Sequence, residues 1–308
     1  MTGACKDFCI PMDGDVFISQ IIERCENLIK TGIWEGLDII RLQIWMKNFE
    51  TPNERYFAAC VLDALIYRSE AQTIAMMKQL FQRIIPDLLR QDTLQQSDSD
   101  WYLALKKSKN EGDPYIRIVP VIQKTDSPAT SSPPICRLYR RGVGLNQDWM
   151  IWPQDIGKAR DCGANKFLFV DDFLGTGTQF SKFATQFHLE KKLKDVYAIY
   201  APLVAHEKGI VKLRGILPEL RVCAVEMLDD KYNLFSKKSM WFRDQTNTPE
   251  RARTFYDALL RKKRLYIKKS RMIGYGQLAI AYAFAHAIPN NCLPLLWLKR
   301  NWNPLFER

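Results

Sequence analysis

Two adjacent carboxylates, Asp171 and Asp172, precede a short stretch of glycine and threonine, Gly175–Thr178. Small residues that lead into the first turn of a helix leave backbone N–H groups available, and the helix dipole adds a positive end. Such a loop suits a phosphate group. The sequence therefore places an acidic pair directly before a candidate phosphate-binding loop.

The flanking residues indicate which elements hold the acids and the loop. Four apolar residues, Phe167–Val170, form the continuous run that a strand buried in a parallel sheet requires. After the loop, apolar residues recur at helical spacing, namely Phe180, Phe183, Ala184 and Phe187. We expect a strand that ends at Val170, then the acids, the loop and a helix. Ligands of open parallel sheets bind beyond the carboxyl ends of the strands, which is where this pattern puts the acids.

The segment Lys166–Phe180 resembles the phosphoribosyl pyrophosphate (PRPP) signature of type I phosphoribosyltransferases: four apolar residues, two acids, two apolar residues and a Thr-Gly loop. The resemblance implies an α/β fold with a parallel sheet of that type. It implies that Asp171 and Asp172 hold the ribose hydroxyls at the catalytic centre. The residues that it assigns to the 5′-phosphate are Gly175, Thr176, Gly177, Thr178 and Gln179.

Two positions depart from the usual signature. Gly175 stands where many members have Asp or Ala, so a general base that is sometimes supplied there is missing. Gln179 stands where a Ser or Thr usually closes the loop. The phosphate would therefore lose one hydroxyl hydrogen bond relative to the common pattern.

The same resemblance implies a cofactor and a site for pyrophosphate. Mg²⁺ is the usual partner of the departing diphosphate, and Asp171 and Asp172 match its preference for one or two carboxylates. Arg140 and Arg141 are the pyrophosphate candidates, because arginine suits phosphate oxygens. The preceding Pro- and Ser-rich stretch, Lys124–Pro134, is expected to be a mobile loop.

Type I enzymes also bind an acceptor base beneath a variable hood. The candidates for this base pocket are His286, Asn290 and Asn291, because Asn side chains suit a base edge. Each of them has an alternative interpretation as a turn or core residue.

Other phosphate motifs fit the sequence less well. A Rossmann loop requires a third glycine where this chain has Phe180, and a Walker A loop requires Gly-Lys-Thr or Gly-Lys-Ser. A phosphatase motif requires Asp-x-Asp, but Asp171 is followed directly by Asp172. The remaining alternative is a turn in which the carboxylates only cap a helix.

Composition bounds the class of protein. The 308 residues are 47% hydrophobic and 26% charged, as in ordinary globular proteins. No apolar run approaches the roughly 20 residues of a membrane span, and the N-terminus does not resemble a signal peptide. The eight cysteines are scattered without a Cys-x-x-Cys pair. We therefore expect a cytoplasmic protein with reduced thiols and no membrane partner.

Positive charge is concentrated near the end of the chain. The net charge is +11, and Arg261–Arg264 is followed by Lys268, Lys269 and Arg271. Such a cluster favours polyanions, with a solvated helix end as the alternative. The nucleic-acid candidates are Lys262, Lys263, Lys268 and Lys269.

Hydrophobic periodicity divides the chain into two regions. Residues 1–108 show helical spacing and helix-start signals such as Thr51–Glu54. Residues 109–308 alternate strands and helices, which predicts the parallel α/β domain. The expected helices include Glu207–Leu217 and one that Thr248–Glu250 opens. The expected strands are Tyr115–Ile122, Val196–Ala201, Leu220–Met227 and Leu278–Phe284, besides the one before Asp171.

Two functions are consistent with these features. The first is an enzyme that binds PRPP or a related 5′-phosphorylated ribosyl donor and transfers or cleaves at the anomeric carbon. The second is an inactive module of the same fold that binds a nucleotide or nucleic acid within a partner complex. The long helical front end also resembles phosphoribosyltransferase-like proteins of bacterial defence loci, including those with retrons. That resemblance implies a toxic effector restrained by a partner, such as a nucleoprotein.

Overall fold

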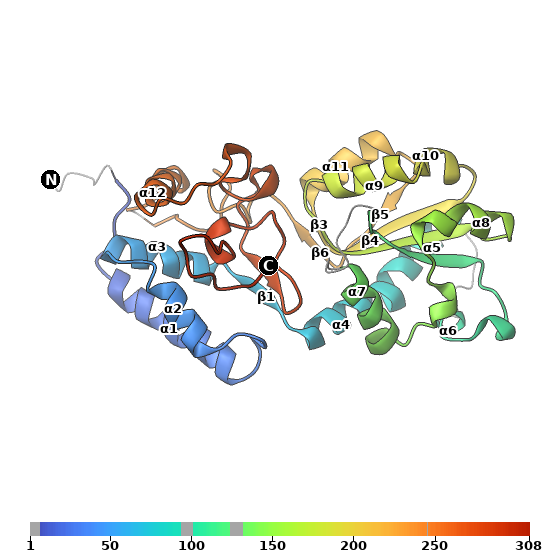
Figure 1. The fold of residues 1–308 in the computed structure, drawn as a ribbon, viewed down its shortest axis with the longest axis horizontal. Coiled ribbons are helices and arrows are strands. Elements are labelled where there is room, and N and C mark those ends of the chain that lie inside the picture. The colour runs from blue at the N-terminus through green and yellow to red at the C-terminus, as the bar shows by residue number, and fades with distance from the viewer. Residues whose placement is uncertain (1–6, 94–100, 124–131, 245) are drawn as a thin grey trace. The chain divides into compact units, whose positions relative to one another are not determined.

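The computed structural model describes residues 7–93, 101–123, 132–244 and 246–308 (Figure 1). The chain forms two compact units. Unit 1 consists of Met1–Glu70 together with Asp229–Arg308, and unit 2 consists of Ala71–Leu228. Unit 1 is thus built from both ends of the chain, whereas unit 2 is continuous and contains the acids and the loop.

Unit 2 alternates helices with parallel strands. Its helices are α4 (Glu70–Gln79), the π-helix η1 (Leu80–Ile84), α5 (Ile85–Thr93), α6 (Trp101–Ala104), α7 (Ser132–Leu138), the π-helix η3 (Tyr139–Val143), α8 (Ile156–Asp161), α9 (Thr178–Gln186), α10 (Leu189–Lys192) and α11 (Glu207–Ile216), with short 3₁₀ turns at Lys109–Glu111, Gln147–Trp149 and Pro153–Asp155. Its strands are β2 (Ile116–Pro120), β3 (Lys166–Leu174), β4 (Tyr197–His206), β5 (Arg221–Val222) and β6 (Glu226–Leu228).

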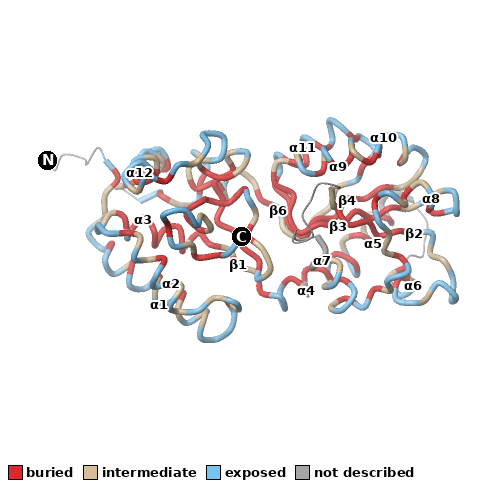
Figure 2. The backbone as a smooth tube through the Cα atoms, in the orientation of Figure 1, coloured by how far each residue is buried: buried red, intermediate tan, exposed pale blue. Residues whose placement is uncertain are grey.

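The five strands of unit 2 form one parallel sheet (Figure 1). Their order is β2-β3-β4-β5, and β6 also pairs with β4. β3 is central, because it pairs with β2 from Lys166 to Val170 and with β4 from Lys166 to Leu174. Every residue of β3 after Lys166 is buried, which explains its continuous apolar run (Figure 2).

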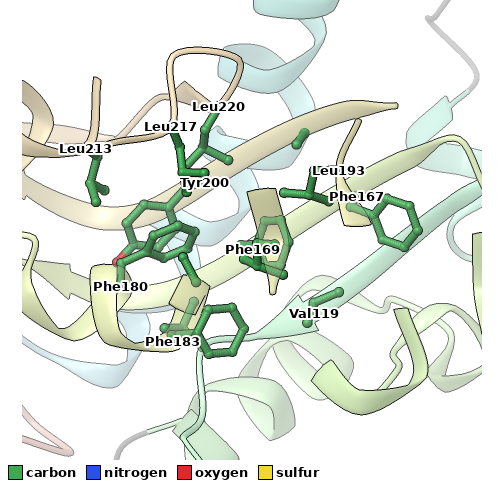
Figure 3. Close-up of a cluster of buried hydrophobic side chains, with 14 of the residues drawn as sticks. Val119, Phe167, Phe169, Phe180, Phe183, Leu193, Tyr200, Leu213, Leu217 and Leu220 are labelled. Atoms are coloured by element: carbon green, nitrogen blue, oxygen red, sulfur yellow. The ribbon is translucent and has the colours of Figure 1, made fainter. Parts of the chain in front are cut away.

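Aromatic packing holds the helix after the loop against the sheet. Phe180 and Phe183 of α9 surround Phe169 of β3, with ring centroids 5.7 Å and 5.9 Å away (Figure 3). Phe180 also stacks on Tyr200 of β4 at 4.1 Å. The start of α9, and with it the loop, is therefore fixed by a buried aromatic cluster.

Helices that precede the sheet in the chain also pack in unit 2. Phe81 of η1 stacks on Trp101 at 5.6 Å and lies 5.2 Å from Tyr139 of η3. Ile85 and Leu89 of α5 line a narrow space together with strand residues such as Leu168. These helices therefore belong to the core of the sheet unit.

Unit 1 combines helices with a two-stranded sheet. Its elements are α1 (Gly14–Lys30), α2 (Ile39–Met46), α3 (Pro52–Asp63), β1 (Ile66–Arg68), α12 (Pro249–Lys262), η6 (Lys269–Arg271), η7 (Tyr275–Gln277), β7 (Tyr282–Phe284) and η8 (Pro294–Leu296). β1 pairs in parallel with β7. Phe57 of α3 lies 5.5 Å from Phe255 of α12, so the two ends of the chain share one core.

Two predicted helix starts are confirmed in unit 1. The Thr51 side chain accepts a hydrogen bond from the Glu54 amide at the start of α3. Thr248 does the same for Arg251 at the start of α12. In both helices proline occupies the first turn, as the sequence indicated.

The division of the chain differs from the predicted boundary at residue 108. Pairing of β1 with β7 joins the first helices to the last eighty residues, and the packing of α5 joins residues 71–108 to the sheet. Long-range pairing of this kind leaves no local signal in the sequence. Part of the prediction holds, because among the described residues no strand before β2 joins the five-stranded sheet.

Two predicted strands also differ from those observed. The expected strand Leu278–Phe284 is reduced to β7 and pairs with β1 instead of joining the parallel sheet. The expected strand Leu220–Met227 is interrupted between β5 and β6, and both short pieces pair with β4. The predicted mobile loop Lys124–Pro134 falls largely outside the described residues, and α7 begins at Ser132.

Two simpler expectations concern membranes and thiols. Across the part of the chain that the structure describes, no helix has both the length and the apolar character needed to cross a bilayer. The seven cysteines within the described residues are free thiols, and Cys5 lies outside them.

Candidate functional site

The predicted order of strand, acids, loop and helix is confirmed. β3 is followed by Gly175–Gly177, and α9 begins at Thr178. Gly177 adopts a left-handed conformation with φ of 74°, which glycine tolerates without strain. The strand is longer than expected, because β4 continues alongside and pairs with β3 as far as Leu174. Asp171 and Asp172 therefore lie within β3, near its carboxyl end.

The loop is closed on one side by helix α11. A Cβ atom added to Gly209 of α11 would lie 2.5 Å from the carbonyl oxygen of Gly175. A Cβ atom on Gly177 would lie 3.0 Å from the Gly209 oxygen. Glycine at both positions therefore permits a close backbone approach that fixes the shape of the loop.

Three polar side chains meet at the mouth of the loop. The Oγ1 atoms of Thr176 and Thr178 are 3.1 Å apart, and Lys212 Nζ donates to Thr178 Oγ1 at 3.0 Å. Lys212 lies on α11, one turn beyond Gly209. A cation and two hydroxyls thus gather where a helix N-terminus already favours an anion. Gln179 is exposed beside them.

Sequence reasoning missed Lys212, although a signal was present. Gly209 and Lys212 are three residues apart on a predicted helix, so they share one face. Only the structure shows that this face meets the loop.

The acidic pair is buried, and its two carboxyl groups are adjacent in the strand. The exposed fractions of Asp171 and Asp172 are 2% and 8%. The Asp172 amide donates to Asp171 Oδ1 at 3.0 Å, and the Tyr200 hydroxyl donates to Asp171 Oδ2 at 2.9 Å. Burial first, and then the charge of Asp172, raise the pKa of Asp171 well above its usual value, although the Tyr200 hydrogen bond opposes them. The pair therefore holds a proton to a higher pH than an exposed carboxylate would.

The helical segment α7–η3 packs next to the acids. Tyr139 is fully buried, and its hydroxyl has no hydrogen-bond partner among the residues that the structure describes. Burial raises the pKa of Tyr139, and the charges of Cys136 and of both acids raise it further. Burial and the charge of Asp171 likewise raise the pKa of the Cys136 thiol to about 12. This segment therefore lies beside the acids, and neither Tyr139 nor Tyr200 was singled out from the sequence.

The pyrophosphate candidates lie on the same segment. Arg140 and Arg141 follow Tyr139 on η3, and both are exposed. Tyr139 therefore points into the core while the two arginines reach solvent. Arg140 and Arg141 thus belong to unit 2, as do the acids and the loop.

The candidate donors for a metal ion at this site are the two carboxylates of the acidic pair. Among the described residues, no three His, Cys, Asp or Glu side chains gather closely enough to form a metal site. Two adjacent carboxylates fit Mg²⁺ only when a ligand supplies further oxygen atoms. The residues present therefore suit a metal ion that arrives with a diphosphate.

The base-pocket candidates belong to unit 1 and are not part of the site that unit 2 forms by itself. Asn291 is buried and its side chain donates to the Tyr275 oxygen at 2.8 Å. Asn290 is exposed, and its carbonyl accepts from the Tyr275 amide at 2.7 Å. Both asparagines therefore hold a turn together, which is the alternative that the sequence left open.

His286 has a different setting in unit 1. Its ring stacks on Phe284 at 5.1 Å. It also lines a cavity of about 350 Å³ together with Arg41 and Glu307, which form an ion pair at 2.9 Å.

The nucleic-acid candidates divide into two kinds. Lys262 lies 2.6 Å from Glu54 Oε1, and Lys263 lies 2.8 Å from Glu50 Oε1. Lys268 and Lys269 are exposed, and neither forms an ion pair with a described carboxylate. The first two hold α12 against α3, whereas the last two are available to solvent.

Comparison with known proteins places this architecture in a family. Neither the curated proteins nor the solved structures include a match to the chain. The sequence model of the family described as PRTase-CE matches residues 42–308, which include most of unit 1 and all of unit 2. The match thus extends well before the α/β region to which the motif itself pointed. The chain belongs to the PRTase-CE family and is a phosphoribosyltransferase-like protein.

Proposed function

We propose that unit 2 binds PRPP or a related 5′-phosphorylated ribosyl donor, and that the chain transfers or cleaves at the anomeric carbon. The observation that supports this most is the closed Gly175–Thr178 loop at the carboxyl end of β3, with Lys212 donating to Thr178 at its mouth. Family membership supports the same class of ligand.

The loop would take the 5′-phosphate. Backbone N–H groups at the start of α9 and the hydroxyls of Thr176 and Thr178 are donors of the right kind. Lys212 would exchange its hydrogen bond to the neutral Thr178 hydroxyl for one to the negatively charged phosphate. Gly177 and Gly209 keep the loop in the shape that this requires.

The acids would take the ribose hydroxyls. Because Asp171 and Asp172 are buried and α7–η3 lies beside them, we propose that this segment shifts when a ribose enters. The same shift would bring Arg140 and Arg141 toward the diphosphate. Binding of the donor and rearrangement of η3 are therefore coupled in this proposal.

Mg²⁺ would be held by Asp171 and Asp172, and it would neutralise the charge of the departing diphosphate. The residues of the chain would fix the ribose, orient the phosphate and exclude water. The bond between the anomeric carbon and the diphosphate oxygen would break, and its electron pair would leave with the diphosphate. Gly175 supplies no base, so the acceptor would give its proton to the leaving group or to solvent.

A binding module without turnover is the second candidate, and the state of Asp171 favours it. Its carboxyl is occupied by the Tyr200 hydroxyl and the Asp172 amide, and its pKa is raised by burial. Release of pyrophosphate from PRPP separates the two candidates. Catalytic release that Asp172→Asn abolishes supports the enzyme, whereas PRPP binding without release supports the module.

We also propose a biological setting, which rests on the resemblance to defence-associated proteins. The chain would act as a toxic effector in a bacterial defence system and would be restrained by a partner. Expression in a bacterial host tests this: arrested growth that Asp172→Asn relieves is expected. Normal growth with the native chain alone would contradict the effector role.

The phosphate site is tested by calorimetric titration with ribose 5-phosphate. Lys212→Gln should weaken binding about tenfold, the effect of losing one charge-assisted hydrogen bond. Lys191→Gln on α10 is the charge-matched control, because this lysine is exposed and belongs to another helix. Equal affinities of the two variants would remove Lys212 from the site, and no binding by the native chain would overturn the proposed phosphate site.

A further inference from the structure

The last part of unit 1 carries positive charge without nearby acidic residues in the sequence. Residues 258–306 contain no Asp or Glu, and they contain nine cations: Arg261, Lys262, Lys263, Arg264, Lys268, Lys269, Arg271, Lys299 and Arg300. Any carboxylate partner must therefore come from elsewhere in the fold. The structure shows which cations receive one.

Two of the nine are neutralised by Glu54 of α3 and by Glu50, which precedes that helix. Lys262 and Lys263 contact Glu54 and Glu50, with closest distances of 2.6 Å and 2.8 Å. Burial raises the pKa of Glu54, but hydrogen bonds from Lys262 and the Glu50 amide and the charge of Lys263 outweigh it and lower the pKa. The hydrogen bond to Glu54 raises the pKa of Lys262 in turn. These lysines therefore fasten α12 to α3, and carboxylates offset the charge of both.

The cations that follow have no such partner. Arg264, Lys268 and Lys269 are exposed, and no ion pair joins them to a described carboxylate. A helix C-terminus attracts cations only within its last turn, and α12 ends at Lys262. Helix capping therefore does not account for Lys268 and Lys269.

An exposed aromatic ring lies among these cations. The exposed fraction of Tyr266 is 82%, whereas Leu265 before it is buried at 6%. Leu265 anchors the chain and Tyr266 projects into solvent between Arg264 and Lys268. Arg271 lies over the ring of Tyr275, with its guanidinium carbon 5.7 Å from the ring centroid. Cations interleaved with aromatic rings are typical of surfaces that bind single-stranded nucleic acid, where bases stack and phosphates pair.

We infer that Arg264–Arg271 forms a surface on unit 1 that binds single-stranded nucleic acid, with Tyr266 as a stacking platform. This surface consists of residues of unit 1, whereas the phosphoribosyl site consists of residues of unit 2. Lys262 and Lys263 are excluded from it, which changes the set of residues indicated by the charge run alone. The cations alone could bind an acidic protein surface, which would not need an exposed aromatic ring. The exposed ring of Tyr266 therefore favours single-stranded nucleic acid over an acidic protein as the partner.

The test is a salt titration of binding to a fluorescent oligothymidylate of about 20 nucleotides. Each phosphate contact with a single strand contributes a slope of about −0.7 in log K against log salt. The triple variant Arg264→Gln/Lys268→Gln/Lys269→Gln should therefore flatten the slope by about 2. Tyr266→Ala should weaken binding about tenfold without changing the slope, because stacking is uncharged.

Two control variants keep the result interpretable. Lys237→Gln/Lys238→Gln removes exposed charge from the same unit and should leave the slope nearly unchanged. Lys262→Gln/Lys263→Gln should lower the melting temperature while leaving the slope nearly unchanged. An unchanged slope in the triple variant, or an equal loss in the Lys237/Lys238 control, would overturn the inference. Equal competition by duplex DNA would overturn the single-strand preference.

Discussion

The two units present positive charge to an anion in different ways. In unit 2 the candidate phosphate site is formed by a backbone loop, a helix start and one lysine, all held by close packing against α11. In unit 1 the basic surface consists of long exposed side chains that make no ion pairs with described carboxylates. The first arrangement depends on shape and tolerates few substitutions. The second is distributed and depends on charge, so salt weakens it.

The largest effect is expected where shape matters most. Gly209→Ala would place a Cβ atom 2.5 Å from the backbone oxygen of Gly175, and neither backbone can yield easily. The variant should lose about 1–3 kcal/mol of unfolding free energy and most of its affinity for ribose 5-phosphate. Thermal denaturation and calorimetric titration measure the two quantities.

Gly215→Ala is the matched control on the same helix. A Cβ atom there meets nothing within 4 Å, so the substitution should be neutral or stabilise the helix by about 0.5 kcal/mol. Similar losses in both glycine variants would contradict the idea that the loop depends on its approach to α11.

A smaller loss of unfolding free energy is expected when the ion pairs of Lys262 and Lys263 in unit 1 are removed. Glu54→Gln leaves Lys262 and Lys263 without their buried partner and should cost about 1–2 kcal/mol at pH 7. The pKa of Glu54 is lower in the folded chain than its usual value of 4.5. The ion pairs of Glu54 therefore add to the unfolding free energy above pH 4.5, and this stabilisation is lost as the pH falls through the pKa of the folded chain.

The pH dependence of denaturation therefore tests this prediction. The difference in unfolding free energy between the native chain and Glu54→Gln should be fully present at pH 7. It should shrink as the pH falls below 4.5, the usual pKa of a glutamate. Glu23→Gln on the exposed face of α1 serves as the control and should show no difference. A gap that persists unchanged at acid pH would contradict the ion-pair explanation.

The smallest expected effect is a gain in stability, in contrast to the losses above. The folded pKa of Asp171 is raised by burial and by Asp172, so ionisation of Asp171 destabilises the fold above its usual pKa of 3.8. Asp171→Asn keeps the shape and can still accept from Tyr200. At pH 8 its melting temperature should exceed that of the native chain by roughly 2–4 °C, and the gain should vanish at acid pH.

A destabilised Asp171→Asn variant at pH 8 would show that the carboxylate is stabilised by its surroundings. Asp155→Asn is a suitable control, because this acid is half-buried at the start of α8 and is not part of the acidic pair. Its melting temperature should change less than that of Asp171→Asn.

Local features of the fold were predictable from the sequence. Apolar Phe167–Val170 predicted β3, and the spacing of Phe180 and Phe183 predicted α9. Threonine and proline predicted the starts of α3 and α12. In each case the determining residues are close in the chain, so periodicity and capping are sufficient.

Features that depend on distant residues were not predictable. β1 and β7 pair although more than two hundred residues separate them, and the sequence of Leu278–Phe284 is equally consistent with a strand of the main sheet. The hydrogen bond from Lys212 to Thr178 depends on how α11 packs on the loop. The partners of Lys262 come from α3, so the charge run alone did not distinguish it from Lys268.

The central claim is that the acids and the loop of unit 2 bind a 5′-phosphorylated ribose. Calorimetric titration of the native chain and of Asp171→Asn/Asp172→Asn with PRPP, with and without Mg²⁺, tests it most directly. We predict Mg²⁺-dependent binding by the native chain and at least about tenfold weaker binding by the variant, because two ribose contacts are lost. Equal binding by both chains would remove the ribose role from the acids, and no binding by the native chain would contradict the claim itself.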